Sequence, residues 1–286
     1  ARQGIDRLRD ILKATPLPGK PDVTLPCPSR RLTVENLTVV APGTGRVLVS
    51  DVSFTLDAGA GLALLGVSAA GKSSLARALV GIWPAHKGVV RLDDAAIEQW
   101  HFDDLGRHIG YLPQDVALLD GSVAENIARL DPNAASEAVL DAARIAGAHE
   151  MILRLPEGYS TRIGEGGTAL SAGQRQRIGL ARSIFGNPFL IVLDEPNANL
   201  DAEGEIALTA AVLALRAKGC IVIVVSHRTS SLAALNMAIV LYEGRAVAFG
   251  PREDVFARVA RGAVVPAFAA AATNTERSRA MGRARA

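Results

Sequence analysis

The sequence predicts an α/β fold built on a mostly parallel sheet, with an antiparallel β-rich part before it and a helical part inserted into it. Apolar runs at 189–195 and 220–226 flank a helical segment at 202–218, which is typical of strands buried on both faces of a parallel sheet. Short β-rich runs separated by Gly and Asp fill 31–66. Apolar residues at helical spacing dominate 116–182 and predict helices at 122–130, at 136–155 and after Ser171.

The amino-acid composition limits which kinds of function the chain is suited to. The chain has 286 residues, of which 49% are hydrophobic and 21% charged, so it can bury a sizeable core. A net charge of only +2 gives no general basicity for binding nucleic acid or anionic lipid. Cys27 and Cys220 lack metal-ligand spacing, and we expect a reducing compartment. Apolar runs such as 220–225 are much shorter than the roughly 20 residues that span a bilayer, so we expect no membrane helix.

Changes in composition and hydrophobic pattern along the chain predict its domain organisation. Residues 1–30 combine a short helix at 1–15 with a Pro-rich linker, and 31–260 form the folded domain, whose helical part covers about 115–182. Residues 261–286 are rich in Ala and Arg, and we expect a solvated tail, with a lipid- or partner-binding arm as the alternative. The chain begins with Ala, and we expect that an upstream part is absent.

The stretch GVSAAGKSS at 66–74 fits the phosphate-binding pattern G-x-x-x-x-G-K-[ST]. It follows the apolar strand 61–66 and opens a helix, the context that separates this motif from a chance glycine-rich turn. Backbone N–H groups would converge on phosphate oxygens, Lys72 would neutralise the β- and γ-phosphates, and Ser73 would ligate Mg²⁺. The predicted nucleotide-binding residues are Gly66, Val67, Ser68, Ala69, Ala70, Gly71, Lys72, Ser73 and Ser74.

A metal-bound triphosphate also needs a carboxylate at the end of a neighbouring strand, and LIVLDEP supplies two candidates. Asp194 suits the Mg²⁺ shell, and Glu195 is placed to act as general base on the attacking water. The alternative is that this Asp-Glu pair only marks a helix entrance. The phosphate-binding motif upstream favours the functional interpretation.

A second loop, LSAGQ at 170–174, precedes an amphipathic helix and would also hold an anion. With it, the motifs resemble, in order over 31–258, the nucleotide-binding domain of an ATP-binding cassette (ABC) transporter. The loop resembles the family's signature loop, in which Ala172 replaces a usual glycine. The resemblance implies a P-loop NTPase ABC-type cassette: a RecA-like parallel core, an N-terminal antiparallel β subdomain and an α-helical signature subdomain.

The resemblance also implies roles for single residues. Gln114 matches the Q-loop and His227 the switch histidine, both catalytic, and Gln114 would also ligate the metal. Asp201 matches the D-loop aspartate. In the family, Ser171, Gly173 and Gln174 of one subunit close over the γ-phosphate held by the other, so the implied partner is a second copy, head to tail, and the implied cofactors are ATP and Mg²⁺. One copy alone would then present only half of each site.

A further stretch resembles exporters within this family. In PEGYSTRIGEGG at 156–167, Thr161, Ile163, Gly164 and Glu165 match the x-loop that touches coupling helices of the membrane domain, although a Gly-rich surface loop remains the alternative. Other stretches, such as 121–130 and 193–201, resemble type I secretion ATPases.

The type I resemblance implies a motor that exports a protein bearing a C-terminal signal. Its implied partners are a transmembrane domain fused upstream, a membrane fusion protein and an outer-membrane channel, with no nucleic acid. The implied location is the cytoplasmic face of the bacterial inner membrane. The alternatives are a stand-alone importer cassette and a soluble ABC ATPase acting on nucleic acid or the ribosome.

Two positions depart from the exporter pattern. Ala41 occupies the slot where most exporters stack an aromatic ring on adenine, which predicts weaker or less base-selective binding unless another side chain such as Arg46 covers the base. Val67 stands where exporters often have Pro, and we expect the loop backbone to tolerate it.

Overall fold

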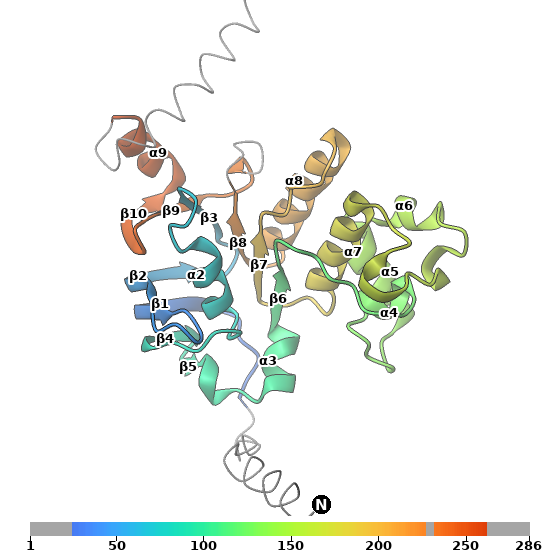
Figure 1. Ribbon diagram of the computed structural model, residues 1–286, viewed down its shortest axis with the longest axis horizontal. Helices are drawn as coiled ribbons and strands as arrows, with labels where there is room; N and C mark the ends of the chain where they lie inside the picture. Colours follow the sequence, from blue (N-terminus) through green and yellow to red (C-terminus); the bar gives the residue numbers. More distant parts are fainter. Residues whose placement is uncertain (1–24, 227–231, 262–286) are drawn as a thin grey trace, which may run out of the picture.

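The computed structural model describes residues 25–226 and 232–261, which form two sheets and a set of helices around them (Figure 1). The predicted helix at 1–15, most of the linker, His227 and nearly all of the C-terminal tail lie outside the described residues. Within these two ranges, no helix combines the length and the hydropathy needed to cross a bilayer.

The first sheet is antiparallel, with strand order β2-β1-β4-β5. Alternate residues of β2, among them Val52, Phe54 and Leu56, are buried, as expected for a sheet with one covered face. The antiparallel β-rich part predicted before the main sheet is therefore confirmed. Its strands are β1 (Arg31–Val40), β2 (Val47–Asp57), β4 (Lys87–Leu92) and β5 (Ala95–Ala96).

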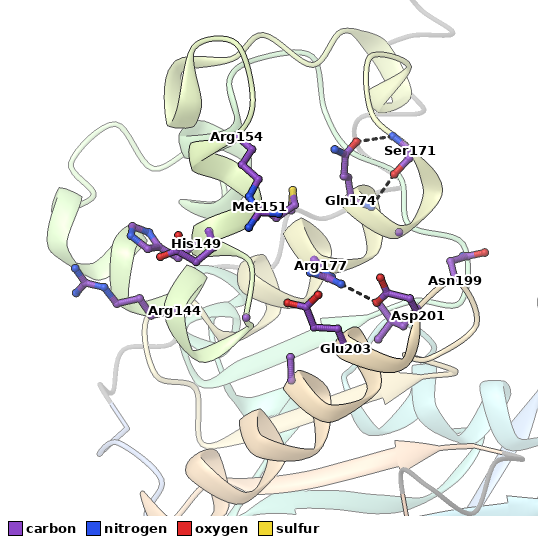
Figure 2. A pocket seen from close by; sticks show the side chains of 15 residues that line it. Arg144, His149, Met151, Arg154, Ser171, Gln174, Arg177, Asn199, Asp201 and Glu203 are labelled. Carbon is purple, nitrogen blue, oxygen red and sulfur yellow. Dashed lines mark hydrogen bonds and ion pairs between the residues drawn. The ribbon is translucent and has the colours of Figure 1, made fainter.

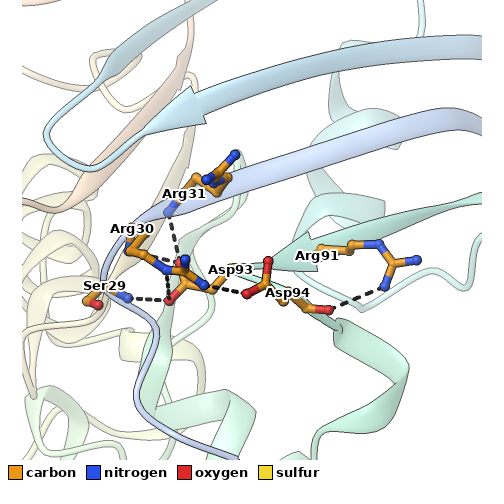
Figure 3. Close-up of polar contacts among 6 residues, drawn as sticks. All are labelled: Ser29, Arg30, Arg31, Arg91, Asp93 and Asp94. Carbon is orange, nitrogen blue, oxygen red and sulfur yellow. Dashed lines mark hydrogen bonds and ion pairs between the residues drawn. The ribbon is translucent and has the colours of Figure 1, made fainter.

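Asp93, in the turn between β4 and β5, fastens the start of the folded domain (Figure 3). Its carboxylate accepts hydrogen bonds from the main-chain N–H groups of Ser29, Arg30 and Arg31 at 3.0, 2.8 and 2.8 Å. Burial alone would raise the pKa of Asp93, but the three main-chain donors outweigh it and hold the pKa below its usual value. The Arg30 guanidinium adds an ion pair to Asp94. This network fixes where the chain enters β1.

The second sheet has strand order β10-β9-β3-β8-β7-β6 and is parallel except for the β9–β10 hairpin. Every residue of β7 and β8 is buried, which explains their uninterrupted apolar sequences. The mostly parallel sheet is confirmed. Its strands are β3 (Gly61–Gly66), β6 (Ile109–Leu112), β7 (Leu190–Asp194), β8 (Ile221–Val225), β9 (Met237–Tyr242) and β10 (Arg245–Pro251).

The helices surround the two sheets (Figure 1). Helices α4 to α7 stand together beyond β6 and β7, at the right of the view, while α2 lies between the two sheets. The helices are α2 (Lys72–Leu79), α3 (Phe102–His108), α4 (Val123–Ile127), α5 (Ser136–Ile145), α6 (His149–Leu153), α7 (Ala172–Ile184), α8 (Ala202–Ala217) and α9 (Arg252–Ala260), with 3₁₀ turns η1 (Ile97–Gln99), η2 (Gly158–Ser160) and η3 (Glu165–Gly167).

Two helices predicted from the sequence are shorter than expected. The segment 122–130 is helical only to Ile127, because Arg129 and Leu130 adopt left-handed backbone conformations with φ of 57° and 60°. The segment 136–155 is divided into α5 and α6 at Gly147, whose φ is 63°.

Successive residues of the parallel strands point to opposite faces of the sheet and build two cores. Ile191 and Leu193 face the core shared with α4, α5, α7 and α8, whereas Leu190 and Val192 face the core shared with α2 and the antiparallel sheet. The parallel sheet is thus covered on both sides. Since β3, β6 and β7 run in the same direction, the loops that follow them meet at one edge.

Candidate functional site

The loop between β3 and α2 wraps around the side chain of Lys72. Its Nζ donates hydrogen bonds to the carbonyls of Gly66 and Val67, both at 2.9 Å. Gly71 precedes α2 with φ of 98°, and a Cβ there would lie 2.5 Å from the Leu48 carbonyl oxygen of β2, so only glycine fits. Ser68 and Ala69 at the crest are exposed. The loop is therefore a preformed turn at a helix N-terminus, with a cation beneath it.

Asp194 and Glu195 stand at the end of β7, close enough to Lys72 to act on its charge. Burial lowers the pKa of Lys72, and the Glu195 and Asp194 carboxylates partly oppose that shift. Burial raises the pKa of Asp194, and the neighbouring Ser73 hydroxyl, which interacts with this carboxylate without completing a hydrogen bond, lowers it in part. The phosphate loop and the strand-end carboxylates thus form one electrostatic unit.

Gln114 joins this unit from the loop after β6. Its Nε2 donates to Oε2 of Glu195 at 3.2 Å. The main-chain N–H of Glu195 donates to the carbonyl of Val225 at 3.0 Å, and Glu195 itself has a φ of 50°. A non-glycine residue in this strained conformation is common at functional sites.

The carboxylate of Asp194 is suited to bind a magnesium ion whose other ligands come mainly from the substrate. Asp194 is 1% exposed, and neither of its oxygens accepts a hydrogen bond within the described part of the chain. Among the residues that the structure describes, no three His, Cys, Asp or Glu side chains gather to hold a metal. Mg²⁺ commonly binds through one or two carboxylates plus phosphates and waters, which agrees with a single buried carboxylate beside the phosphate loop.

The second anion cradle begins α7. Ser171 and Gln174 form a reciprocal cap: the Ser171 Oγ accepts from the Gln174 N–H at 3.2 Å, and the Ser171 N–H donates to Gln174 Oε1 at 2.8 Å. Gly173 lies so close to the next loop that a Cβ would be 3.0 Å from the Asn199 carbonyl oxygen. Ser171 is exposed, so the cradle faces outward.

Asp201 lies beside this second cradle, at the start of α8. Its Oδ1 accepts from the Gly204 N–H and from Arg177 Nη2, both at 2.8 Å. The Gly204 N–H and then Arg177 hold the pKa of Asp201 below its usual value. The motif analysis missed Arg177, because nothing local in the sequence indicates its partner on another helix.

A cavity of about 820 Å³ joins the second cradle to the Asp201 loop (Figure 2). Ser171, Gly173, Gln174 and Asp201 line it together with side chains of α6. The structure therefore forms two separate clusters, since none of the described residues lining this cavity comes from 66–74.

The residues predicted by resemblance divide between these clusters. The first cluster contains Lys72, Gln114, Asp194 and Glu195. The second contains Ser171, Gly173, Gln174 and Asp201. In the 156–167 stretch, Thr161 and Ile163 are buried. Ala41 lies in the turn before β2, where its N–H donates to the Arg46 carbonyl at 2.8 Å.

A sequence model described as ABC transporter matches residues 49–198, more than half of the chain. The chain belongs to the ABC transporter family. It contains the family's ATP-binding ATPase domain, and the ABC-type fold predicted from its motifs is confirmed. The matched range includes the phosphate loop, the signature loop and the strand-end carboxylates of this ABC domain.

Relatives of the ABC domain include a type I secretion protein and a lipid flippase. It is 55% identical over 261 residues to the type I secretion system ATP-binding protein PrsD of Rhizobium meliloti (strain 1021), covering 91% of this chain and 45% of the relative. It is 39% identical over 231 residues to an ATP-dependent lipid A-core flippase of Pseudomonas fluorescens (strain Pf0-1), covering 80% of this chain and 38% of that relative. The chain thus spans less than half the length of either relative.

Among solved structures, the ABC domain resembles a bacterial Atm1-family ABC exporter with ATP bound. The TM-score is 0.80 at 27% sequence identity, over 96% of this chain and 47% of that one. The likeness extends beyond the matched motifs to the arrangement of both sheets and the helices.

Proposed function

We propose that this ABC domain is the ATP-driven motor of a type I secretion exporter, and that each ATP is bound between two copies of the domain. The observation that carries the proposal is the separation of two anion cradles, the Lys72 loop and the Ser171 loop, which line different surfaces of one chain. A single triphosphate does not need two cradles in one subunit. Two copies placed head to tail give each triphosphate one cradle of each kind.

In the proposed site, the phosphate loop and Lys72 bind the triphosphate, and Ser73, Asp194 and Gln114 hold Mg²⁺. The ion, when bound, neutralises charge on the β- and γ-phosphates. The N-terminus of α7 in the second copy, with Ser171, Gly173 and Gln174, adds partial positive charge from the opposite side. Asp201 of that copy steadies this end of α7 through Arg177.

Glu195 accepts a proton from the attacking water in this proposal. Gln114 donates to the Glu195 carboxylate at 3.2 Å and so orients it. His227 would complete the catalytic set as the family's switch histidine. Hydrolysis and separation of the two copies are then coupled, because loss of the γ-phosphate removes the group that both copies bind.

The assignment to type I secretion is supported by the 55% identity to a type I secretion ATP-binding protein. We propose that the domain works at the cytoplasmic face of the bacterial inner membrane, with a transmembrane domain fused upstream. A membrane fusion protein, an outer-membrane channel and an exported protein with a C-terminal signal complete the proposed assembly.

Stimulation of ATP hydrolysis by a passenger protein tests this assignment. We expect the full-length protein, reconstituted in vesicles, to hydrolyse ATP about twofold or more faster with a genomically neighbouring passenger, since a bound substrate shifts the population toward the closed state. The same passenger lacking its C-terminal segment is the control. Equal rates with the intact and truncated passengers would contradict the assignment to type I secretion.

Replacement of Asp194 tests the metal site through stability alone. We expect Asp194→Asn to raise the free energy of unfolding of the nucleotide-free protein by about 1 kcal/mol, because it removes a buried charge without a hydrogen-bond partner. The pKa of Asp194 is raised in the folded state, so stability contributed by this group falls as pH rises above the ordinary value of 3.8. Asp194→Asn should abolish that part of the pH dependence.

Thermal unfolding in EDTA, and again with Mg²⁺ and ATP, measures both effects. Asp103→Asn is the control, because the Asp103 side chain is 82% exposed. We expect Mg²⁺ to add stability in the presence of ATP for the wild type and the control only. A Mg²⁺-dependent gain of wild-type size in Asp194→Asn would refute the metal assignment.

A further inference from the structure

Arg129 joins three parts of the fold through main-chain carbonyls. Its Nε donates to the carbonyl of Arg182 at 3.0 Å, and its Nη2 donates to that of Ser183 at 3.1 Å, both near the end of α7. Its Nη1 donates to the carbonyls of Ile109 at 3.2 Å and Gly106, at the junction of α3 and β6. One side chain just after α4 therefore ties the start of β6 to the C-terminal end of α7.

This arrangement is maintained at a cost to stability. Arg129 and Leu130 are consecutive non-glycine residues in the left-handed region, a conformation that persists only where surrounding contacts enforce it. Burial lowers the pKa of Arg129 to about 10, so the guanidinium remains charged at neutral pH. In the described part of the chain it has no carboxylate partner, and carbonyl dipoles alone compensate its charge. Packing of the Arg129 side chain does not by itself explain why a charged group occupies this position.

The elements that Arg129 ties together lead to the catalytic loop. From β6 the chain runs to Gln114 and then to Ala117, whose carbonyl accepts from Arg182 Nη2 at 2.9 Å. Two residues further on, the main chain of Leu119 is bound by the side chain of Asn126 in α4. The Asn126 Oδ1 accepts from the Leu119 N–H, and the Asn126 Nδ2 donates to the Leu119 carbonyl, both at 2.9 Å. After α4, Arg129 returns to Ile109, 20 residues before it in sequence.

We propose that Arg129 is a positioning residue, which closes the loop that begins at Ile109 and thereby holds Gln114 against Glu195. The inference rests on the catalytic roles proposed above for Gln114 and Glu195. Arg129 acts through Gln114 and does not itself contact the nucleotide. Its removal should therefore impair the catalytic step and leave nucleotide binding at the Lys72 loop intact.

A double-mutant cycle between Arg129 and Gln114 tests this role. Steady-state ATP hydrolysis of the full-length protein is measured for Arg129→Ala, Gln114→Ala and the double variant. We expect Arg129→Ala to lower kcat by about tenfold with the KM for ATP within about threefold, and to lower kcat less than about twofold when Gln114 is already Ala. Equal losses of kcat in both backgrounds, or a raised KM with unchanged kcat, would overturn the proposal.

Arg216→Ala is the matched control, since Arg216 also donates to main-chain carbonyls, those of Gly59 and Ala234, but at the opposite end of β3. We expect it to lower the thermal midpoint while kcat stays within about twofold of wild type. Arg129→Lys, which keeps the charge but not the fork of donors, should give an intermediate kcat and replaces Arg129→Ala in the cycle if that variant does not fold.

Turnover of Glu195→Gln, measured beside the cycle, separates this inference from the proposed function. Undiminished turnover in Glu195→Gln would refute the catalytic roles and this inference together. An inactive Glu195→Gln combined with additive Arg129 and Gln114 effects would refute the positioning role alone.

Discussion

Glu195→Gln is expected to reduce steady-state ATP hydrolysis by at least about 10²-fold, the usual contribution of a general base. The substitution keeps the shape of the side chain and an oxygen that can accept from Gln114, but an amide does not accept a proton from water. Nucleotide affinity should change less than about threefold, because Lys72, Ser73 and Asp194 are unaltered. With ATP and Mg²⁺, the variant should accumulate as a dimer.

Hydrolysis by phosphate release, affinity by titration and dimer formation by gel filtration measure the three effects. Glu98→Gln is the control, since Glu98 is an exposed residue of η1 in the antiparallel part of the fold. Turnover of Glu195→Gln at the control's rate would show that another group takes the proton.

Lys72→Ala should abolish detectable hydrolysis for a different reason, the loss of nucleotide binding. Lys72 is 7% exposed, and its ammonium donates to two carbonyls of its own loop, so we expect it both to neutralise phosphate and to hold the loop closed. Charge-assisted hydrogen bonds contribute about 1.5–3 kcal/mol each, so ATP affinity should fall by about 10- to 100-fold or more.

Titration with a fluorescent ATP analogue measures this loss, and Lys87→Ala is the matched control because Lys87 is exposed on β4. The thermal midpoint without nucleotide checks that Lys72→Ala is folded. A folded Lys72→Ala with wild-type affinity would contradict the assignment of the phosphate loop.

Features that depend on local sequence were predictable. The phosphate loop follows from a strand, a glycine pattern and a helix within a few residues, and β3 has the expected bounds while α2 begins where the motif opens a helix. Asp194 and Glu195 follow from a short apolar strand for the same reason. The family and its fold were also predictable, since they depend on the order of such motifs.

Features that depend on distant partners were not predictable. The Gln114–Glu195 contact spans 81 residues, and no pattern in either segment specifies it. The early end of α4 depends on Arg129 finding carbonyls on α3, β6 and α7, which override the helical periodicity of 122–130. Helix α3 and strands β4 to β6 were not assigned, because 81–116 shows no clear period.

Mixing two inactive variants tests the shared site most directly. Lys72→Ala disables the first cradle, and Gly173→Asp disables the second by placing a Cβ near the Asn199 carbonyl and a negative charge at the anion cradle. If each ATP is held by two copies, a mixed dimer contains one intact site, formed by the unaltered cradle of each chain. If each copy hydrolyses ATP alone, every chain in the mixture remains defective.

The decisive measurement is ATP hydrolysis by an equal mixture of the two variants, refolded or co-expressed so that chains pair at random. Half of the dimers are then mixed and each has one of two sites intact, so we expect about a quarter of the wild-type rate. A mixture no more active than either variant alone would contradict a nucleotide site shared between two copies.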